Sequence, residues 1–194
     1  MADQDNKKID IELTIRASLD SEWADNDLIG LTETLPGLQL DYPELAKDVA
    51  TFLAENLDNV DWTVTYKITR IALALPGLQR IQPKLARQIA LKVNDSLDDI
   101  NWGNTHEVKR ITSVLDVLAQ VLPGIEERIA DEIEAAVGSI VWKDSHDLVR
   151  MSKAVGPFRK VRPQLSEKIA SRINDKLNII DTVSYTHLTL PTKA

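Results

Sequence analysis

Residues 61–100 read DWTVTYKITRIALALPGLQRIQPKLARQIALKVNDSLDDI, and residues 101–140 repeat the same pattern. In both stretches a tryptophan stands second and a proline stands twenty-third. The chain has four tryptophans, separated by 39, 40 and 40 residues, and a set of four prolines separated by 40: Trp23, Trp62, Trp102, Trp142, Pro43, Pro83, Pro123 and Pro163. Two rare residue types share one period, which indicates an array of forty-residue repeats.

Each repeat carries two apolar stripes with helical spacing. The first stripe has spacings of three, four and three, as in Ile68, Ile71, Leu75 and Leu78, and in the fourth repeat as Leu148, Met151, Val155 and Phe158. The second stripe follows the proline and steps by four, as in Leu85, Ile89, Val93 and Leu97. We therefore predict an all-α fold, an α-solenoid or superhelix of about four two-helix repeats of 40 residues.

Short polar or helix-breaking residues mark the expected helix ends. Asp25, Thr65, Thr105 and Ser145 precede the first stripes and are expected to cap the first helices. The turns between paired helices are expected at Pro36-Gly37, Pro76-Gly77 and Gly156-Pro157. The third repeat has Asp116-Val117 there instead, so its first helix is expected to continue to about Val121.

The two ends depart from the repeat. Residues 9–15 alternate like a strand, but Ile11, Ile15 and Leu19 also step by four, and we favour a leading half-repeat helix. The segment VSYTHLTLPTKA at 183–194 resembles translated adaptor read-through at the end of a shotgun gene fragment. On that interpretation the native protein continues, and the fourth repeat exposes a face meant for a fifth.

The predicted organisation has three parts. Residues 1–10 are expected to be a disordered N-terminus, and residues 182–194 a non-native or disordered tail. Between them, residues 11–181 form the helical-repeat domain. Its repeats lie at about 19–60, 61–100, 101–140 and 141–180.

Composition narrows the classes of protein to consider. The 194 residues include no cysteine, which excludes disulfides and thiolate metal sites and favours a reducing, cytoplasmic location. No apolar run is long enough to cross a bilayer, so no membrane association is expected. The net charge of -7 argues against wrapping nucleic acid with the whole surface.

Helix pairs of this length, with prolines at the turns and an arginine column at Arg70, Arg110 and Arg150, resemble the HEAT and armadillo class of α-solenoids. The resemblance covers about residues 11–180 and lies in architecture and spacing, since the tryptophan column is not part of the HEAT consensus. It implies a curved stack whose surfaces bind partner proteins or, in some branches, nucleic acid. We interpret the tryptophans as packing between repeats and the arginines as tying neighbouring repeats together, rather than as ligand sites.

Two histidine pairs raise a metal hypothesis. His106-Glu107 and His146-Asp147 resemble the His-Glu pairs that hold two irons in HEAT-type deoxyhypusine hydroxylases. One pair here is His-Asp, however, and the equivalent positions of the first two repeats are Asn26-Asp27 and Tyr66-Lys67. We therefore predict no catalytic residue, no metal site and no cofactor, and keep metal-dependent hydroxylation as a remote alternative.

Charge differs between the repeats. Residues 19–60 carry a net charge of -9, and residues 141–180 carry +5. Within the basic repeat, we expect Phe158, Arg159, Lys160 and Arg162 to lie in the turn between helices and to form a partner-binding patch. The sequence has no nucleophile motif, metal-ligand set or Gly-rich phosphate loop that would indicate an enzyme, so the leading hypothesis is a non-enzymatic protein–protein interaction scaffold. The alternative is a HEAT-like nucleic-acid-binding module of the DNA-repair type that uses the basic fourth repeat.

Overall fold

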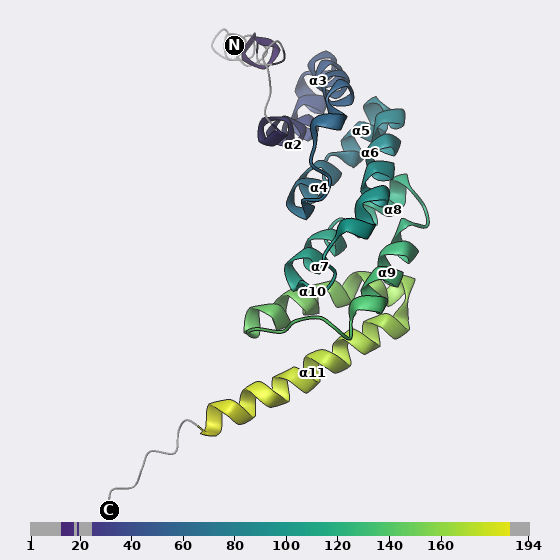
Figure 1. Cartoon of the computed structure of the whole chain (residues 1–194). Helices are drawn as coiled ribbons and strands as arrows, with labels where there is room; N and C mark the ends of the chain where they lie inside the picture. Colours follow the sequence, from purple (N-terminus) through teal and green to yellow (C-terminus); the bar gives the residue numbers. More distant parts are fainter. Residues whose placement is uncertain (1–12, 18, 20–24, 187–194) are drawn as a thin grey trace, which may run out of the picture. The chain divides into compact units, whose positions relative to one another are not determined.

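The structure is a computed structural model that describes residues 13–17, 19 and 25–186, and every regular element among them is helical (Figure 1). The predicted all-α class is therefore confirmed. These residues group into two compact units. Unit 1 comprises the residues up to Ile100 together with Val117–Pro123, and unit 2 comprises Asn101–Asp116 and the residues from Gly124 onward.

Unit 1 contains the first two repeats. Its elements are α2 (Asp25–Asp41), α3 (Pro43–Glu55), the 3-10 turn η1 (Leu57–Asn59), α4 (Thr65–Ala72), α5 (Leu75–Ile81), α6 (Pro83–Ser96), the 3-10 turn η2 (Leu97–Asp99) and the part of α8 (Leu115–Val121) from Val117 onward. The hairpin partners α2 and α3 pack together, as do α5 and α6, and α2 also contacts α4 and α5 of the next repeat. The predicted stripes form the core, with at most 1% exposure at Leu35, Leu45, Leu53, Ile68, Leu75 and Ile89.

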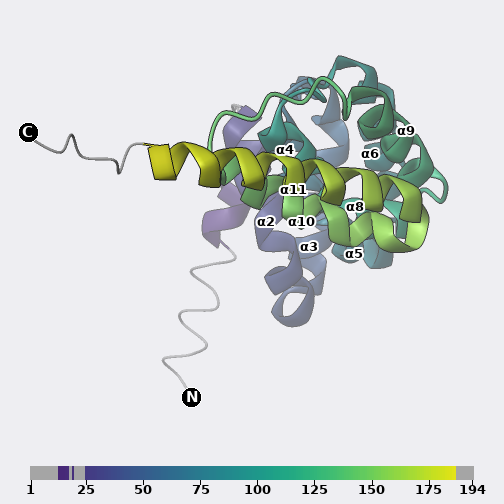
Figure 2. The ribbon, with the colours of Figure 1, turned by 90° about the horizontal axis from the view of Figure 1, so that it is seen from below.

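Unit 2 contains α7 (Thr105–Thr112), α9 (Ile125–Ala136), α10 (Ser145–Val161) and α11 (Pro163–Thr186). Helices α10 and α11 lie side by side as an antiparallel pair (Figures 1 and 2), and α10 also packs on α7 and α9. The core residues Ile129, Ile133, Met151, Phe158, Leu165 and Ile169 have no measurable exposure. Full burial of one such side chain contributes about 1.5–3 kcal/mol, so the stripes hold each unit together.

The chain reverses at the residue before the proline. Tyr42, Gln82 and Arg162 have φ near -141, -145 and -143°, outside the helical region, and Pro43, Pro83 and Pro163 open the helices that follow. A proline ring clashes with a preceding residue in α conformation, which ends the first helix there. The predicted turns at Pro36-Gly37, Pro76-Gly77 and Gly156-Pro157 are therefore wrong, because these pairs lie inside α2, α5 and α10.

The third repeat differs from the others. Its second helix starts at Ile125, two residues after Pro123, because Gly124 occupies a left-handed conformation (φ 97°) as the N-cap. Its first helix was expected to run unbroken to about Val121, but it is divided into α7 and α8 at Ser113–Val114. The second repeat is divided at the equivalent Leu73–Ala74, into α4 and α5, so the break does not depend on the hydroxyl of Ser113.

The helix caps lie one residue earlier than predicted in two repeats. Asn104 caps α7 by accepting from the His106 amide, and Asp144 forms a capping box with Asp147 at the start of α10. Thr105 and Ser145 are the first helical residues instead. Val64, which has no capping side chain, precedes α4.

The predicted ends are tested only in part. Residues 13–17 and 19 are helical, which confirms the helix over the strand for these positions, and Arg16 forms an ion pair with Asp48 on α3. Helix α11 continues to Thr186, five residues into the segment expected to be a tail. The predicted disordered segment 1–10, Trp23 and residues 187–194 lie outside the described residues.

Replacing Phe158 by alanine should lower the free energy of unfolding by about 3–5 kcal/mol, because it removes a fully buried aromatic ring from the core of unit 2. Chemical denaturation measures this loss. The neighbouring Arg159→Ala, at an exposed position of the same helix, should change stability by less than about 0.5 kcal/mol. Equal effects of the two substitutions would contradict the assignment of Phe158 to the core.

Candidate functional site

The basic segment at the end of α10 is mostly internal. Phe158 has 0% exposure, so the prediction that it belongs to a partner-binding patch is wrong. The first stripe of the fourth repeat ends on this residue, and the ring therefore faces the core. The segment also lies in the last turn of α10 rather than in the interhelical turn, and only Arg162 stands between the helices.

Arg162 is held by acidic residues of α9. Its guanidinium donates to Glu127 at 2.6 Å, to Asp131 at 2.5 Å and to Glu134 at 3.2 Å. The hydrogen bonds that Arg162 donates to Asp131 and then to Glu127 raise the pKa of Arg162 above its ordinary value. Its charge is compensated within unit 2, so of the predicted patch only Arg159 and Lys160 remain as exposed cations.

The arginine column makes different contacts in each repeat. Arg70 on α4 forms a two-pronged ion pair with Glu33 on α2, and its guanidinium also contacts the Tyr66 hydroxyl at 2.7 Å. The hydrogen bonds that Glu33 accepts from Arg70 lower the pKa of Glu33. The other two arginines pair within their own helices, Arg110 with Glu107 at 3.4 Å and Arg150 with Asp147 at 2.7 Å. Thus Arg70 directly joins two repeats.

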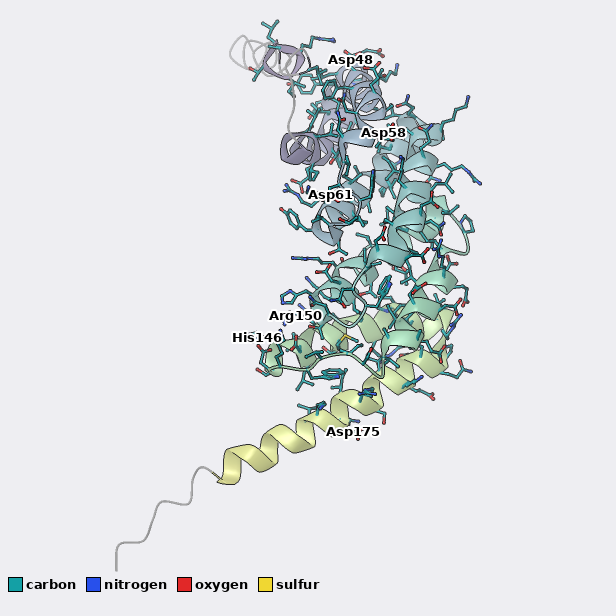
Figure 3. The ribbon with its side chains drawn as sticks, in the orientation of Figure 1. Asp48, Asp58, Asp61, His146, Arg150 and Asp175 are labelled. Carbon is teal, nitrogen blue, oxygen red and sulfur yellow. The ribbon has the colours of Figure 1, made fainter. Side chains whose placement is uncertain are left out.

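Asp147 is the centre of a buried polar cluster near the start of α10, where Figure 3 shows the neighbouring side chains of His146 and Arg150. Its carboxylate, 5% exposed, accepts from the Thr105 hydroxyl on α7, from Arg150 and from the backbone N–H of Lys143 at 2.7 Å. Burial alone would raise the pKa of Asp147, but the hydrogen bonds from Thr105, Lys143 and Arg150 outweigh it and lower the pKa to about 2. The cluster joins the third repeat to the fourth.

A groove of about 530 Å³ opens beside this cluster in unit 2. Its lining is polar: Asn101, Gly103, Asn104, Thr105, His106, Ser139, Val141, Lys143, Asp144, Asp147 and Arg150. The exposed charges on its walls have both signs, and the Asp147 carboxylate is already occupied by four hydrogen bonds. The groove therefore shows no clear preference for a cation or an anion.

The two histidine pairs do not form a metal-binding group. In the part of the chain that the structure describes, no three or more His, Cys, Asp or Glu side chains lie close enough together to hold an ion. His106 and His146 are exposed. Their acidic neighbours Glu107 and Asp147 form ion pairs with Arg110 and Arg150.

The described tryptophans are half-buried or buried. Trp62 is half-buried, and its indole N–H donates to the Leu57 carbonyl at 3.1 Å. Trp102 is 6% exposed. Trp142 is half-buried, and its indole nitrogen is buried. None of the three presents a fully exposed ring to a ligand.

Unit 1 contains a second, more apolar groove of about 620 Å³. It lies between the first and second repeats and is lined by Pro36, Gln39, Leu40, Pro43, Ala46, Lys47, Leu73, Pro76, Gly77, Arg80 and Ile81. The two leucines of this lining are unusually accessible, Leu40 with 84% exposure and Leu73 with 54%. We call this surface the unit 1 groove.

The floor of the unit 1 groove is fixed by one hydrogen bond. The Gln39 side-chain amide donates to the Gly77 carbonyl at 2.6 Å and so joins α2 to α5. Gly77 leaves room for this contact, because an added Cβ would lie 3.2 Å from the Gln39 amide oxygen. This hydrogen bond fixes the position of α2 relative to α5 at the groove.

Leu40 and Leu73 are not among the residues predicted from the sequence to form a site, although their repeat positions carry a usable signal. The positions equivalent to Leu40 in the later repeats are Arg80, Gln120 and Lys160. The positions equivalent to Leu73 are Glu33, Ser113 and Lys153. A leucine at a repeat position that is polar in the other repeats is expected on the surface, where it indicates a binding role rather than a core role.

No protein-family profile, curated protein or solved structure matches this chain. The site is therefore defined by its own geometry. Among the described residues, no helix combines the length and the apolar character needed to cross a bilayer.

The Asp147 cluster predicts an acid-sensitive unfolding. Because the pKa of Asp147 is about 2 in the folded chain against 3.8 for a free aspartate, the stabilisation is complete above about pH 4 and is lost as the pH falls toward 2. Asp147→Asn should cost about 1–3 kcal/mol at pH 7 and flatten this pH dependence. Denaturant titrations at a series of pH values measure both effects.

The exposed aspartate Asp175 on α11 provides the control, and Asp175→Asn should leave stability and its pH dependence near those of the parent chain. Thr105→Val should reproduce part of the loss at pH 7, because it removes the hydroxyl donor from the third repeat. Unchanged stability in both Asp147→Asn and Thr105→Val would contradict the role of the cluster.

Proposed function

We propose that this chain is a non-enzymatic protein-interaction scaffold. In this proposal the hairpins continue from one repeat to the next as an α-solenoid of the HEAT and armadillo type, and the unit 1 groove binds a helical segment of a partner protein. The regular contacts between first helices, α2 with α4 and α7 with α10, support such a stack within each unit. The absence of cysteine supports a cytoplasmic location.

The observation that carries the proposal is the exposure of Leu40 and Leu73 on the walls of the unit 1 groove. Burying apolar surface contributes roughly 25 cal/mol per Å², so two accessible leucines beside a preformed groove can provide much of the binding energy. The groove already holds its shape through the Gln39–Gly77 hydrogen bond, which lowers the entropic cost of binding.

Charge defines the chemistry of the partner. The charged residues that line the unit 1 groove, Lys47 and Arg80, are both cationic, and Lys47 also forms an ion pair with Glu44 at 2.7 Å. An amphipathic helix that places apolar side chains on the leucines and carboxylates toward Lys47 and Arg80 would complement both features. We therefore take the partner to be an acidic amphipathic helix.

The nucleic-acid alternative has less support. It depended on the basic patch of the fourth repeat, and the charge of Arg162 is compensated by α9. Arg159 and Lys160 would supply only two phosphate contacts. The metal-dependent hydroxylase alternative gains no specific observation from the arrangement of His106 and His146.

The binding test uses a synthetic amphipathic peptide of about 18 residues, with leucines on one face and glutamates along its flanks. Fluorescence anisotropy should give a dissociation constant on the order of 10–100 μM. The double variant Leu40→Lys, Leu73→Lys should weaken binding at least about tenfold, because it removes both apolar contacts. Its stability should stay within about 0.5 kcal/mol of the parent chain, because both side chains are exposed.

Leu91→Lys is the matched control, since Leu91 is also an exposed leucine, at 40%, but lies on α6 outside the unit 1 groove. A peptide with lysines in place of the glutamates should bind more weakly to the parent chain and gain affinity for Arg80→Glu. The proposal fails if neither peptide binds, if Leu91→Lys weakens binding as much as the double variant, or if the chain binds an oligonucleotide and not the peptide.

A further inference from the structure

One face of the fourth repeat is exposed. The equivalent face is buried in the first and third repeats, which are each followed by another hairpin of the same unit. On the second helix, Ala50, Leu53 and Leu57 of the first repeat are 0, 0 and 6% exposed, and Ala130, Ile133 and Val137 of the third repeat are 0, 0 and 1% exposed. At the equivalent positions of α11, Ala170 and Ile173 are partly exposed and Leu177 is 45% exposed.

The first helix shows the same difference. Thr32 and Thr112 are 0 and 3% exposed, whereas the equivalent Ser152 on α10 is exposed. Ile29 is 0% exposed, whereas the equivalent Val149 is 53% exposed. Thr105 is 2% exposed, whereas the equivalent Ser145 is exposed.

These positions form one continuous surface, because α10 and α11 pack side by side and each set follows helical spacing. We call it the open face and define it by Ser145, Val149, Ser152, Ala170, Ile173 and Leu177. Helices α10 and α11 pack against each other (Figures 1 and 2), and both carry residues of the open face. The small and apolar side chains of the open face are of the kind that a packed helix covers elsewhere in this chain.

The contact between the third and fourth repeats indicates what an occupant should supply. There, the Thr105 hydroxyl donates to the Asp147 carboxylate, which comes from the hairpin that covers the third repeat. Ser145 presents the equivalent hydroxyl on the open face. A hairpin that docks in the same way would place a carboxylate opposite Ser145.

Charge points to the same kind of occupant. In each unit a negatively charged repeat lies beside a positive one: residues 19–60 carry -9 and residues 61–100 carry +2, while residues 101–140 carry -4 and residues 141–180 carry +5. Where Glu33 of the first repeat receives Arg70 from the next repeat, the fourth repeat has the exposed cation Lys153. An acidic hairpin complements this surface, and a basic one is repelled.

We propose that the open face binds an acidic α-helical hairpin of the same forty-residue repeat type, with a carboxylate that accepts from Ser145 and acidic side chains near Lys153. This site is separate from the unit 1 groove. Binding at either surface can be present or absent without the other.

The test supplies the hairpin in the same chain. A copy of residues 21–60, with a net charge of -8 and with Asp27 at the position equivalent to Asp147, is joined after Ile180 in place of residues 181–194, so that the period continues. Backbone hydrogen exchange at residues 170–177 should slow at least about tenfold relative to the full parent chain, because covered helices exchange through rarer opening events.

The matched control joins a copy of residues 61–100 at the same place, with a net charge of +2 and with Lys67 at the position equivalent to Asp147. It should slow exchange at residues 170–177 clearly less than the acidic copy does. Leu177→Lys should remove the protection in the chain with the acidic copy, while changing the unfolding midpoint of the parent chain little, because Leu177 is already 45% exposed there.

Three results would overturn the proposal: no slowing with the acidic copy, equal slowing with the basic copy, or protection that persists after Leu177→Lys. The residues of the unit 1 groove are unchanged in all these chains. Peptide binding in the unit 1 groove can therefore be measured in parallel and reports on the scaffold proposal independently.

Discussion

The structure depends on a steric constraint that the proline at the start of the second helix places on the residue before it. This constraint produces the helical hairpins. The backbone of Tyr42, Gln82 and Arg162 is excluded from the helical region by the ring that follows, so the first helix must stop and the chain must turn back. The reversal brings two apolar stripes face to face. Neither stripe could be buried by a single helix, and the hairpin is therefore the smallest folding element of this chain.

Neighbouring hairpins within each unit are held together by polar contacts as well as by apolar ones. Cations of the later repeat reach back to acids of the earlier one, as in Arg70 with Glu33, Lys92 with Asp58 and Arg162 with three carboxylates of α9. Each exposed pair adds at most about 1 kcal/mol. Because the ion pairs contribute little stability, their main effect is on specificity. Together with the buried Thr105–Asp147 hydrogen bond, they favour one order and one register of the hairpins.

Two surfaces remain unused by the stack, and each differs from its neighbours in a way that the repeat makes visible. The unit 1 groove has leucines at positions that are polar in the other repeats, and the open face has small and apolar residues whose equivalents are buried. Both suit helical partners. Lys47 and Arg80 line the unit 1 groove, and Lys153 stands exposed beside the open face.

The sequence alone was sufficient to predict the all-α class, the forty-residue period and the core stripes, because periodic apolar burial is a local property that repetition reinforces. The two predicted helices per repeat are found in the first and fourth repeats, whereas the first helix is divided in the second and third. It did not determine the helix ends, since Pro36 is tolerated inside α2 and the first helices of the second and third repeats are divided at Leu73–Ala74 and Ser113–Val114. Nor could it decide between the two uses of Phe158, which belongs both to a stripe and to a basic segment. Only the packing of α10 buried its ring, and only the approach of α9 neutralised Arg162. Exposure and charge compensation depend on which residues of other helices come near, and tertiary structure alone decides that.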